Sequence, residues 1–227
     1  MFEPKYIVSS KLLENIKRIV KLTYELNSKR FSKVVLMTLV KRAREISAHA
    51  STSIEGNPLP LTEVKRILKH HPQYVRDSER EVLNYNNAFV ELEKLTEKKN
   101  TSFDLSLVLN IHKTVMEELI SLSRWGKIRE EAVFVNDPKV GQVVYWPPDH
   151  QDVKGLVDEL FDFVAKNKDK IDPLILAGLF HKQLVIIHPF MDGNGRTVRL
   201  ATKVLLSAMG LNTFSLFSFE NYYNKNV

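Results

Sequence analysis

Apolar residues recur every three to four positions along most of the chain, the spacing that places them on one face of an α-helix. This spacing predicts helices near residues 9–28, 31–55, 62–70, 76–98, 104–120, 150–167, 173–187 and 195–209. Asp104, Asp149 and Asp172 precede three of these segments as N-cap residues, and Pro173 suits a first helical position. We therefore expect an all-α fold.

One region between the predicted helices has a different pattern. Residues 129–135 and 140–146 are rich in β-branched and aromatic side chains, and residues 136–139 between them are turn formers. This pattern predicts a β-hairpin. A hairpin is marginally stable by itself, so we expect it to lie over another surface, in a functional or a purely structural role.

Composition narrows the class of protein. Of the 227 residues 44% are hydrophobic and none is cysteine, which fits an ordinary core and excludes disulfides and thiolate chemistry. The amino end lacks a signal-peptide pattern and no apolar run approaches a membrane span, so we expect a cytoplasmic protein without membrane contact. The formal charge of +6 comes from 33 basic and 27 acidic residues that are interspersed, which favours solvated helix faces over a nucleic-acid surface.

The segment 188–199, His-Pro-Phe-Met-Asp-Gly-Asn-Gly-Arg-Thr-Val-Arg, combines several groups that bind phosphate. Gly193 and Gly195 allow a backbone turn whose N–H groups converge on an anion, and the helix predicted to follow adds its positive end. Arg196 and Arg199 are three residues apart and share a helix face, where both guanidinium groups can grip phosphate oxygens.

Two further side chains of this segment suit reactions of phosphate groups. Asp192 offers a hard oxygen ligand of the kind that Mg²⁺ uses when substrate and water supply the rest, and His188 is suited to proton transfer at neutral pH. Each residue type alone is more often a cap, a packed side chain or an ordinary loop. Because all of them stand in one short segment, we predict a site for the phosphates of a nucleotide.

This segment matches every fixed position of the Fic family signature, H-x-F-x-D/E-G-N-G-R-x-x-R, and the chain resembles that family. The resemblance implies an all-helical domain that transfers AMP from ATP to a hydroxyl of a target protein. It implies His188 as general base, Asp192 as ligand of Mg²⁺ or Mn²⁺, and Phe190 as an inward anchor. The implied ATP-binding residues are Gly193, Asn194 and Gly195 for the α- and β-phosphates, Arg196 for the β-phosphate and Arg199 for the γ-phosphate.

Glu55 stands at the end of the helix predicted for residues 31–55, before a glycine and a proline-rich turn. A carboxylate there opposes the helix dipole unless a cation lies nearby, and Ser51 one turn earlier could hydrogen-bond it. The stretch also resembles the inhibitory motif (S/T)-x-x-x-E-(G/N) of many Fic proteins. The resemblance implies that Glu55 pairs with Arg199 in place of the γ-phosphate. An ordinary polar helix end is the alternative.

The predicted hairpin also resembles an element of Fic proteins. Residues 126–129 match a Gly-x-x-Arg that precedes a flap in Fic proteins, and residues 146–148 match its proline-rich exit. The flap is implied to hold the target segment by strand-like pairing, here at Val133, Phe134 and Val135.

The resemblance divides the chain into three parts. Residues 1–100 form an N-terminal helical region with the inhibitory helix at about 33–56, residues 101–215 the catalytic domain, and residues 216–227 the start of a C-terminal helix of what we expect to be a longer protein. Expected partners are ATP and a protein with a Ser, Thr or Tyr hydroxyl, with auto-AMPylation and a homodimer left open. Two other functions stay open: removal of AMP, with Glu55 as base for water, and a non-catalytic regulator that contacts DNA through a module absent here.

Overall fold

The computed structural model describes residues 2–70, 72–96, 102–137, 141–211 and 216–226. In these ranges the helices are α1 (Ser10–Ser28), α2 (Lys33–Ile54), α3 (Leu61–His70), α4 (Asp77–Thr96), α5 (Leu105–Met116), α6 (His150–Asn167), α7 (Pro173–Ile187), α8 (Asn194–Ala208) and α9 (Phe219–Asn226), with a 3₁₀ turn at Leu122–Arg124. Strands β1 (Val135–Asp137) and β2 (Gln142–Tyr145) form a small antiparallel sheet. The predicted helical fold with a hairpin is confirmed. None of the described helices is long and apolar enough to cross a bilayer.

Side-chain caps begin five of the helices. Ser9, Ser32, Asp104, Asp149 and Asp172 each accept a hydrogen bond from a backbone N–H in the first turn of the helix that follows. Such a cap satisfies a donor that the helix itself leaves unpaired and contributes about 1 kcal/mol. The three aspartates predicted to begin helices are therefore confirmed in that role.

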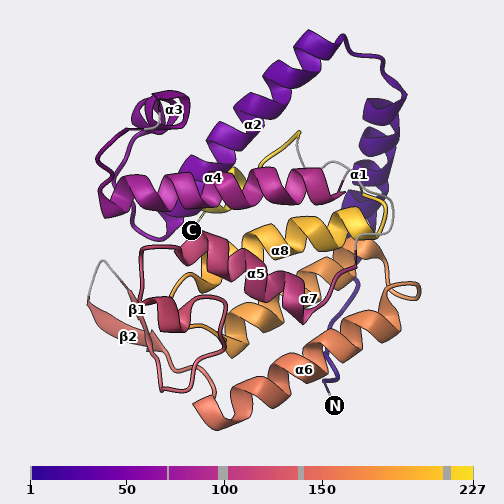
Figure 1. Cartoon of the computed structure of the whole chain (residues 1–227). Helices are drawn as coiled ribbons and strands as arrows, with labels where there is room; N and C mark the ends of the chain where they lie inside the picture. Colours follow the sequence, from indigo (N-terminus) through magenta and orange to yellow (C-terminus); the bar gives the residue numbers. More distant parts are fainter. Residues whose placement is uncertain (1, 71, 97–101, 138–140, 212–215, 227) are drawn as a thin grey trace.

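Helix α8 is the central element of the fold. It packs against α2, α4, α5 and α7, and Figure 1 shows it in the middle of the bundle. Eleven of its 15 residues are buried, including Arg196, Arg199 and Lys203. Because a buried charge is unfavourable without a counter-charge, these three cations need partners from the surrounding helices. The packing of α8 therefore decides which residues meet at the site.

Helix α2 has two different halves. Its first residues, up to Leu39, are exposed, and Figure 1 shows this half extending beyond the bundle. The second half buries small side chains, Ala43, Ser47, Ala48, Ala50, Ser51 and Thr52, which allow close approach to α4, α8 and α9. The end of α2 is thereby held against the core, with Glu55 as its C-cap residue.

The helix predicted for residues 104–120 ends earlier, at Met116. The side-chain amide of Asn84 donates hydrogen bonds to the carbonyl oxygens of Val115 (3.2 Å) and Glu117 (2.7 Å), and Glu118 has a left-handed backbone (φ 58°). A capping group from α4 therefore ends α5, which local periodicity could not reveal.

The predicted hairpin exists, but its strands are shifted. The strand expected at residues 129–135 starts only at Val135, and Asn136 and Asp137, expected in the turn, pair with Val143 and Gln142. The reason lies in Arg129, whose N–H donates to the Pro189 carbonyl and whose side chain donates to the carbonyls of His188, Glu131 and Pro148. These bonds hold the segment against the 188–199 loop. Two parts of these predictions lie outside the described residues. They are residues 138–140 of the predicted turn and second run, and residues 97 and 98 of the predicted fourth helix.

Candidate active site

His188 ends α7 in a left-handed backbone conformation (φ 52°, ψ 60°). Such a backbone costs a residue other than glycine about 1–2 kcal/mol, and strain of this kind is concentrated at functional sites. The Nδ1 atom lies 3.3 Å from the carbonyl oxygen of Val185, so Nδ1–H donates and Nε2 keeps its lone pair. Burial lowers the pKa of His188 below 6.5. The imidazole is therefore neutral at pH 7 and able to accept a proton.

The loop after His188 is closed by its own side chains. Phe190 is buried, and its backbone N–H and carbonyl both bond the side-chain amide of Asn194, at 2.9 and 2.8 Å. Asn194 therefore stabilises the loop through its side chain, while its backbone opens α8. Arg129 adds its bonds to the carbonyls of His188 and Pro189, which anchor the loop from outside.

His112 of α5 is a site residue that the sequence interpretation missed. Its ring stacks on Phe190, with centroids 3.9 Å apart. Nδ1 accepts the N–H of Gly126 at 3.0 Å, so Nε2–H donates to the carbonyl oxygen of Asp192 at 3.1 Å. Burial lowers its pKa to about 4, which keeps this neutral tautomer at pH 7. A histidine on the apolar face of a predicted helix was the available signal, because a buried imidazole needs partners.

The start of α8 presents free backbone donors. Gly193 caps the helix with φ +73°, and a Cβ at this position would overlap the sulfur of Met116. The N–H groups of Asn194, Gly195 and Arg196 precede any helical carbonyl that could accept them, and the described part of the chain offers no other acceptor. These donors, at the positive end of a helix, form a site for an anion.

Arg196 lies beside these donors with part of its bonding capacity unused. Its side chain is 3% exposed, with Nη2 3.3 Å from Asp192 Oδ1 and Nη1 3.3 Å from Glu81 Oε1 as ion pairs. Its Nε and Nη1 atoms have no hydrogen-bond acceptor among the described residues. A buried guanidinium with unused donors can accommodate phosphate oxygens at little cost.

Asp192 fits a cation held mainly by substrate and water. Its Oδ1 accepts bonds from the N–H of Gly193 and from Arg196, and its side chain is 59% exposed. No group of three or more His, Asp or Glu residues that could hold a metal occurs in the described ranges. A single exposed carboxylate matches the mode in which Mg²⁺ binds through one or two carboxylates and phosphate oxygens.

Arg199 is held by the end of α2. Its Nε donates to the Ser51 hydroxyl at 2.8 Å, and its Nη2 donates to the Ser51 carbonyl at 2.8 Å and to Glu55 Oε1 at 2.7 Å. A Cβ on Gly195 would overlap this Glu55 oxygen, so the close approach requires glycine there. The structure thus places Glu55 against Arg199, as the resemblance implied, whereas the Ser51 hydroxyl, expected to bond Glu55, accepts from Arg199 instead.

The hairpin adjoins the site through its second strand. The Tyr145 hydroxyl donates to the carbonyl oxygen of Ile186 at 2.9 Å, two residues before His188. Phe134 is 55% exposed, with its ring centroid 5.9 Å from that of Trp146. Of the residues expected to dock a target, Val135 begins β1, and Val133 and Phe134 immediately precede it. The second strand is tied to α7, and the ring of Phe134 is exposed.

Known proteins resemble this chain in sequence. Residues 102–206 match the model of the Fic/DOC family. The chain is 29% identical over 175 residues to a protein adenylyltransferase Fic of Nematostella vectensis, covering 75% of this chain and 39% of the relative. It is 28% identical over 220 residues to the protein of that name in Aedes aegypti, covering 88% of this chain and 42% of the relative. The chain thus spans about two fifths of the length of these curated relatives.

Solved structures resemble this chain in fold. A Fic family protein from Desulfovibrio desulfuricans G20 superposes with a TM-score of 0.80 at 22% identity, covering 99% of this chain and 66% of that chain. A Fic domain containing signaling protein from Bacteroides thetaiotaomicron gives 0.73 at 21% identity, covering 86% and 73%. The helical arrangement around α8 is therefore that of Fic proteins, and residues 102–206 within it match the Fic/DOC family.

Proposed function

We propose that this chain is a protein adenylyltransferase that transfers AMP from ATP to a hydroxyl side chain of another protein, and that Glu55 restrains it. One observation carries the proposal: a neutral histidine, free helix N–H groups and two buried arginines converge at the start of α8. The curated relatives are named protein adenylyltransferases, which supports the same reaction here. Residues 101–215 are the catalytic part in this proposal and residues 1–100 the regulatory part.

The proposed reaction uses His188 as general base. Its Nε2 accepts the proton of a Ser, Thr or Tyr hydroxyl while the hydroxyl oxygen bonds to the α-phosphorus of ATP. The bond from the α-phosphorus to the oxygen that bridges to the β-phosphorus breaks, and pyrophosphate leaves. The free N–H groups of α8 and the unused donors of Arg196 stabilise the charge that develops on the leaving group. The products are AMP-modified protein and pyrophosphate.

Asp192 is the residue that would hold Mg²⁺ or Mn²⁺. When bound, such an ion would neutralise phosphate charge and so assist departure of pyrophosphate. The His112 bond to the Asp192 carbonyl and the Gly193 N–H bond to its carboxylate keep this residue in place at the loop. The exposed part of the carboxylate then remains directed outward.

Glu55 restrains the reaction by occupying Arg199. The γ-phosphate would need the same guanidinium edge that Glu55 bonds at 2.7 Å, so ATP must displace the carboxylate or bind in a different pose. The two bonds from Arg199 to Ser51 fix the guanidinium toward α2 and add to the restraint. The resting protein is therefore expected to transfer AMP slowly.

The hairpin is proposed to dock the target. Val133, Phe134 and Val135 would present backbone groups and one exposed aromatic ring to an extended segment, which would bring its hydroxyl toward His188. Such pairing is largely backbone-mediated, so it selects an extended segment and not a particular sequence.

The decisive experiment is mass spectrometry of the Glu55→Gly variant after incubation with Mg²⁺ and ATP. We expect a gain of one AMP on a Tyr, Ser or Thr of the protein itself or of an added target, and loss of that gain in Glu55→Gly combined with His188→Ala. The purified modified protein, incubated afterwards with Mg²⁺ and the parent protein that retains Glu55, should not release free AMP. Absence of modification at every Mg²⁺ and ATP concentration tested would refute the proposal, and release of free AMP would assign the reverse reaction.

A further inference from the structure

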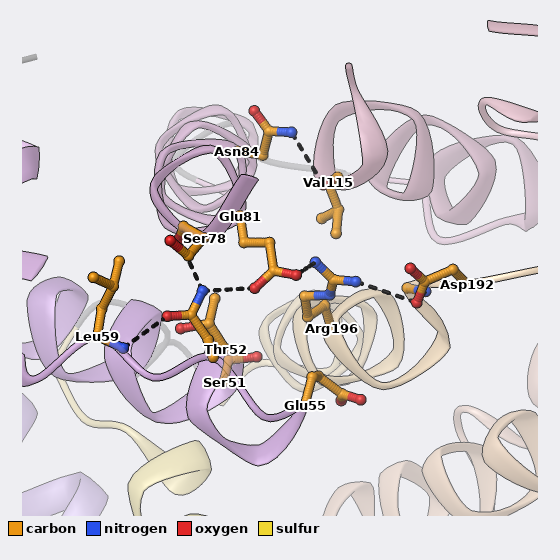
Figure 2. Close-up of polar contacts among 12 residues, drawn as sticks. Ser51, Thr52, Glu55, Leu59, Ser78, Glu81, Asn84, Val115, Asp192 and Arg196 are labelled. Carbon is orange, nitrogen blue, oxygen red and sulfur yellow. Dashed lines mark hydrogen bonds and ion pairs between the residues drawn. The ribbon is translucent and has the colours of Figure 1, made fainter. Parts of the chain in front are cut away.

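Arg196 and Arg199 are each neutralised by a carboxylate from outside the loop. Arg199 pairs with Glu55. Arg196 pairs with Glu81 of α4, as Figure 2 shows. Asp192 also contacts Arg196, but its side chain is 59% exposed, whereas that of Glu81 is 24% exposed. If Asp192 turns toward a cation, Glu81 is the anion that still neutralises the buried guanidinium. No motif in the sequence points to this contact of Glu81.

Glu81 also bonds the turn that carries Glu55. Its Oε2 accepts the side-chain N–H of Asn57 at 2.6 Å, and the same amide nitrogen donates to the carbonyl oxygen of Ser78 at 2.8 Å. The Asn57 oxygen accepts the N–H of Leu59 at 3.1 Å, so this amide closes the turn after α2. One carboxylate thus bridges the turn after Glu55 and the arginine at the start of α8.

We propose that Glu81 is a positioning residue that couples the turn after Glu55 to Arg196. It holds the guanidinium through one oxygen and Asn57 through the other, so the inhibitory turn and the phosphate-binding arginine share a restraint separate from the Glu55–Arg199 bond. The expected effect of Glu81 on ATP binding rests on the proposed function, whereas its coupling to the turn does not. A carboxylate that merely competed with phosphate for Arg196 would have the opposite effect on ATP binding.

The coupling is tested without nucleotide by hydrogen exchange. The amides of Glu55, Gly56 and Asn57 bond to the carbonyls of Thr52 and Ser53, and their exchange reports on the turn. We expect about tenfold faster exchange at these amides in Glu81→Gln and in Asn57→Asp. Asn57→Asp keeps the oxygen that accepts from Leu59 but loses the N–H donors to Glu81 and Ser78.

Glu63→Gln is the matched control, because Glu63 forms an exposed ion pair with Arg66 on α3. In this variant the amides of Glu55, Gly56 and Asn57 should exchange at the rates of the parent protein. Unchanged exchange in Glu81→Gln would overturn the coupling.

The positioning of Arg196 is tested by calorimetry in the Glu55→Gly background. We expect the dissociation constant of Mg-ATP to rise about tenfold when Glu81→Gln is added, measured at a temperature where both proteins are folded, because the buried guanidinium loses its fixed pose. Unchanged or tighter ATP binding would overturn the positioning function.

The two proposals fail in different ways. A Glu55→Gly protein that transfers no AMP, with the exchange effect intact, refutes the adenylyltransferase proposal and leaves the coupling standing. An active Glu55→Gly protein in which Glu81→Gln changes neither exchange nor ATP binding refutes the coupling alone.

Discussion

Replacing Glu55 by glutamine should release the restraint on Arg199 in a graded way. Glutamine keeps the length of the side chain and an oxygen that can accept from Arg199, but it removes the negative charge. Glycine removes the side chain completely. We therefore expect the rate of AMP transfer to rise from the parent to Glu55→Gln and again to Glu55→Gly.

The contact geometry sets the size of the complete release in Glu55→Gly. The bond from Arg199 to Glu55 is 2.7 Å long, and the two side chains are 6% and 34% exposed. A hydrogen bond to a charged group contributes about 1.5–3 kcal/mol, and the partial exposure of Glu55 favours the lower part of that range. Since about 1.4 kcal/mol corresponds to a factor of ten, loss of the whole bond in Glu55→Gly should shift the equilibrium about ten- to thirtyfold toward the open state, and Glu55→Gln should shift it less because its oxygen still accepts from Arg199.

The assay is transfer of labelled AMP at an ATP concentration well below saturation, where the rate follows the open fraction. Ser51→Ala is a useful companion, because it removes only the hydroxyl that accepts from Arg199 Nε and leaves the carboxylate in place. It should raise the rate less than Glu55→Gly does. Equal rates in the parent, Glu55→Gln and Glu55→Gly would refute the reasoning, since the carboxylate would then compete with no phosphate.

Three further predictions concern pH, backbone strain and buried charge. Because the folded pKa of His112 is about 4, against about 6.5 unfolded, the unfolded chain binds the extra proton; the free energy of unfolding should fall between pH 6.5 and 4, and less steeply in His112→Gln, as measured by urea unfolding. Gly193→Ala should weaken ATP binding in calorimetry and lower the thermal midpoint, because its φ of +73° costs alanine about 1–2 kcal/mol and its Cβ meets Met116; wild-type binding would contradict this. Glu220→Ala should lower the free energy of unfolding by about 3–5 kcal/mol, because it leaves the buried charge of Lys203, 3.3 Å away, without this partner; a loss below about 0.5 kcal/mol in urea unfolding would show that the pair is unimportant.

Most of the helices could be predicted because their signals are local. The apolar period and the caps at Asp104, Asp149 and Asp172 depend on neighbours within one or two turns, so the sequence displays them directly. The end of α5 could not be predicted, because Asn84 of another helix ends it. The start of the first hairpin strand was predicted wrongly for a similar reason. The bonds of Arg129 to the 188–199 loop outweigh the strand propensity of residues 129–134.

By itself, the sequence determined the helical architecture and the place of Glu55 at a helix end, and it predicts phosphate binding by residues 188–199. Each of these follows from residue types that stand next to one another. The contact of Glu55 with Arg199, 144 residues later, was expected only from the resemblance, and the tertiary structure makes it. Only the tertiary structure decided that His112 and Glu81 lie beside the site. The physical reason is the burial of α8: its charged side chains need partners, and the packing of α2, α4 and α5 around it selects which residues supply them.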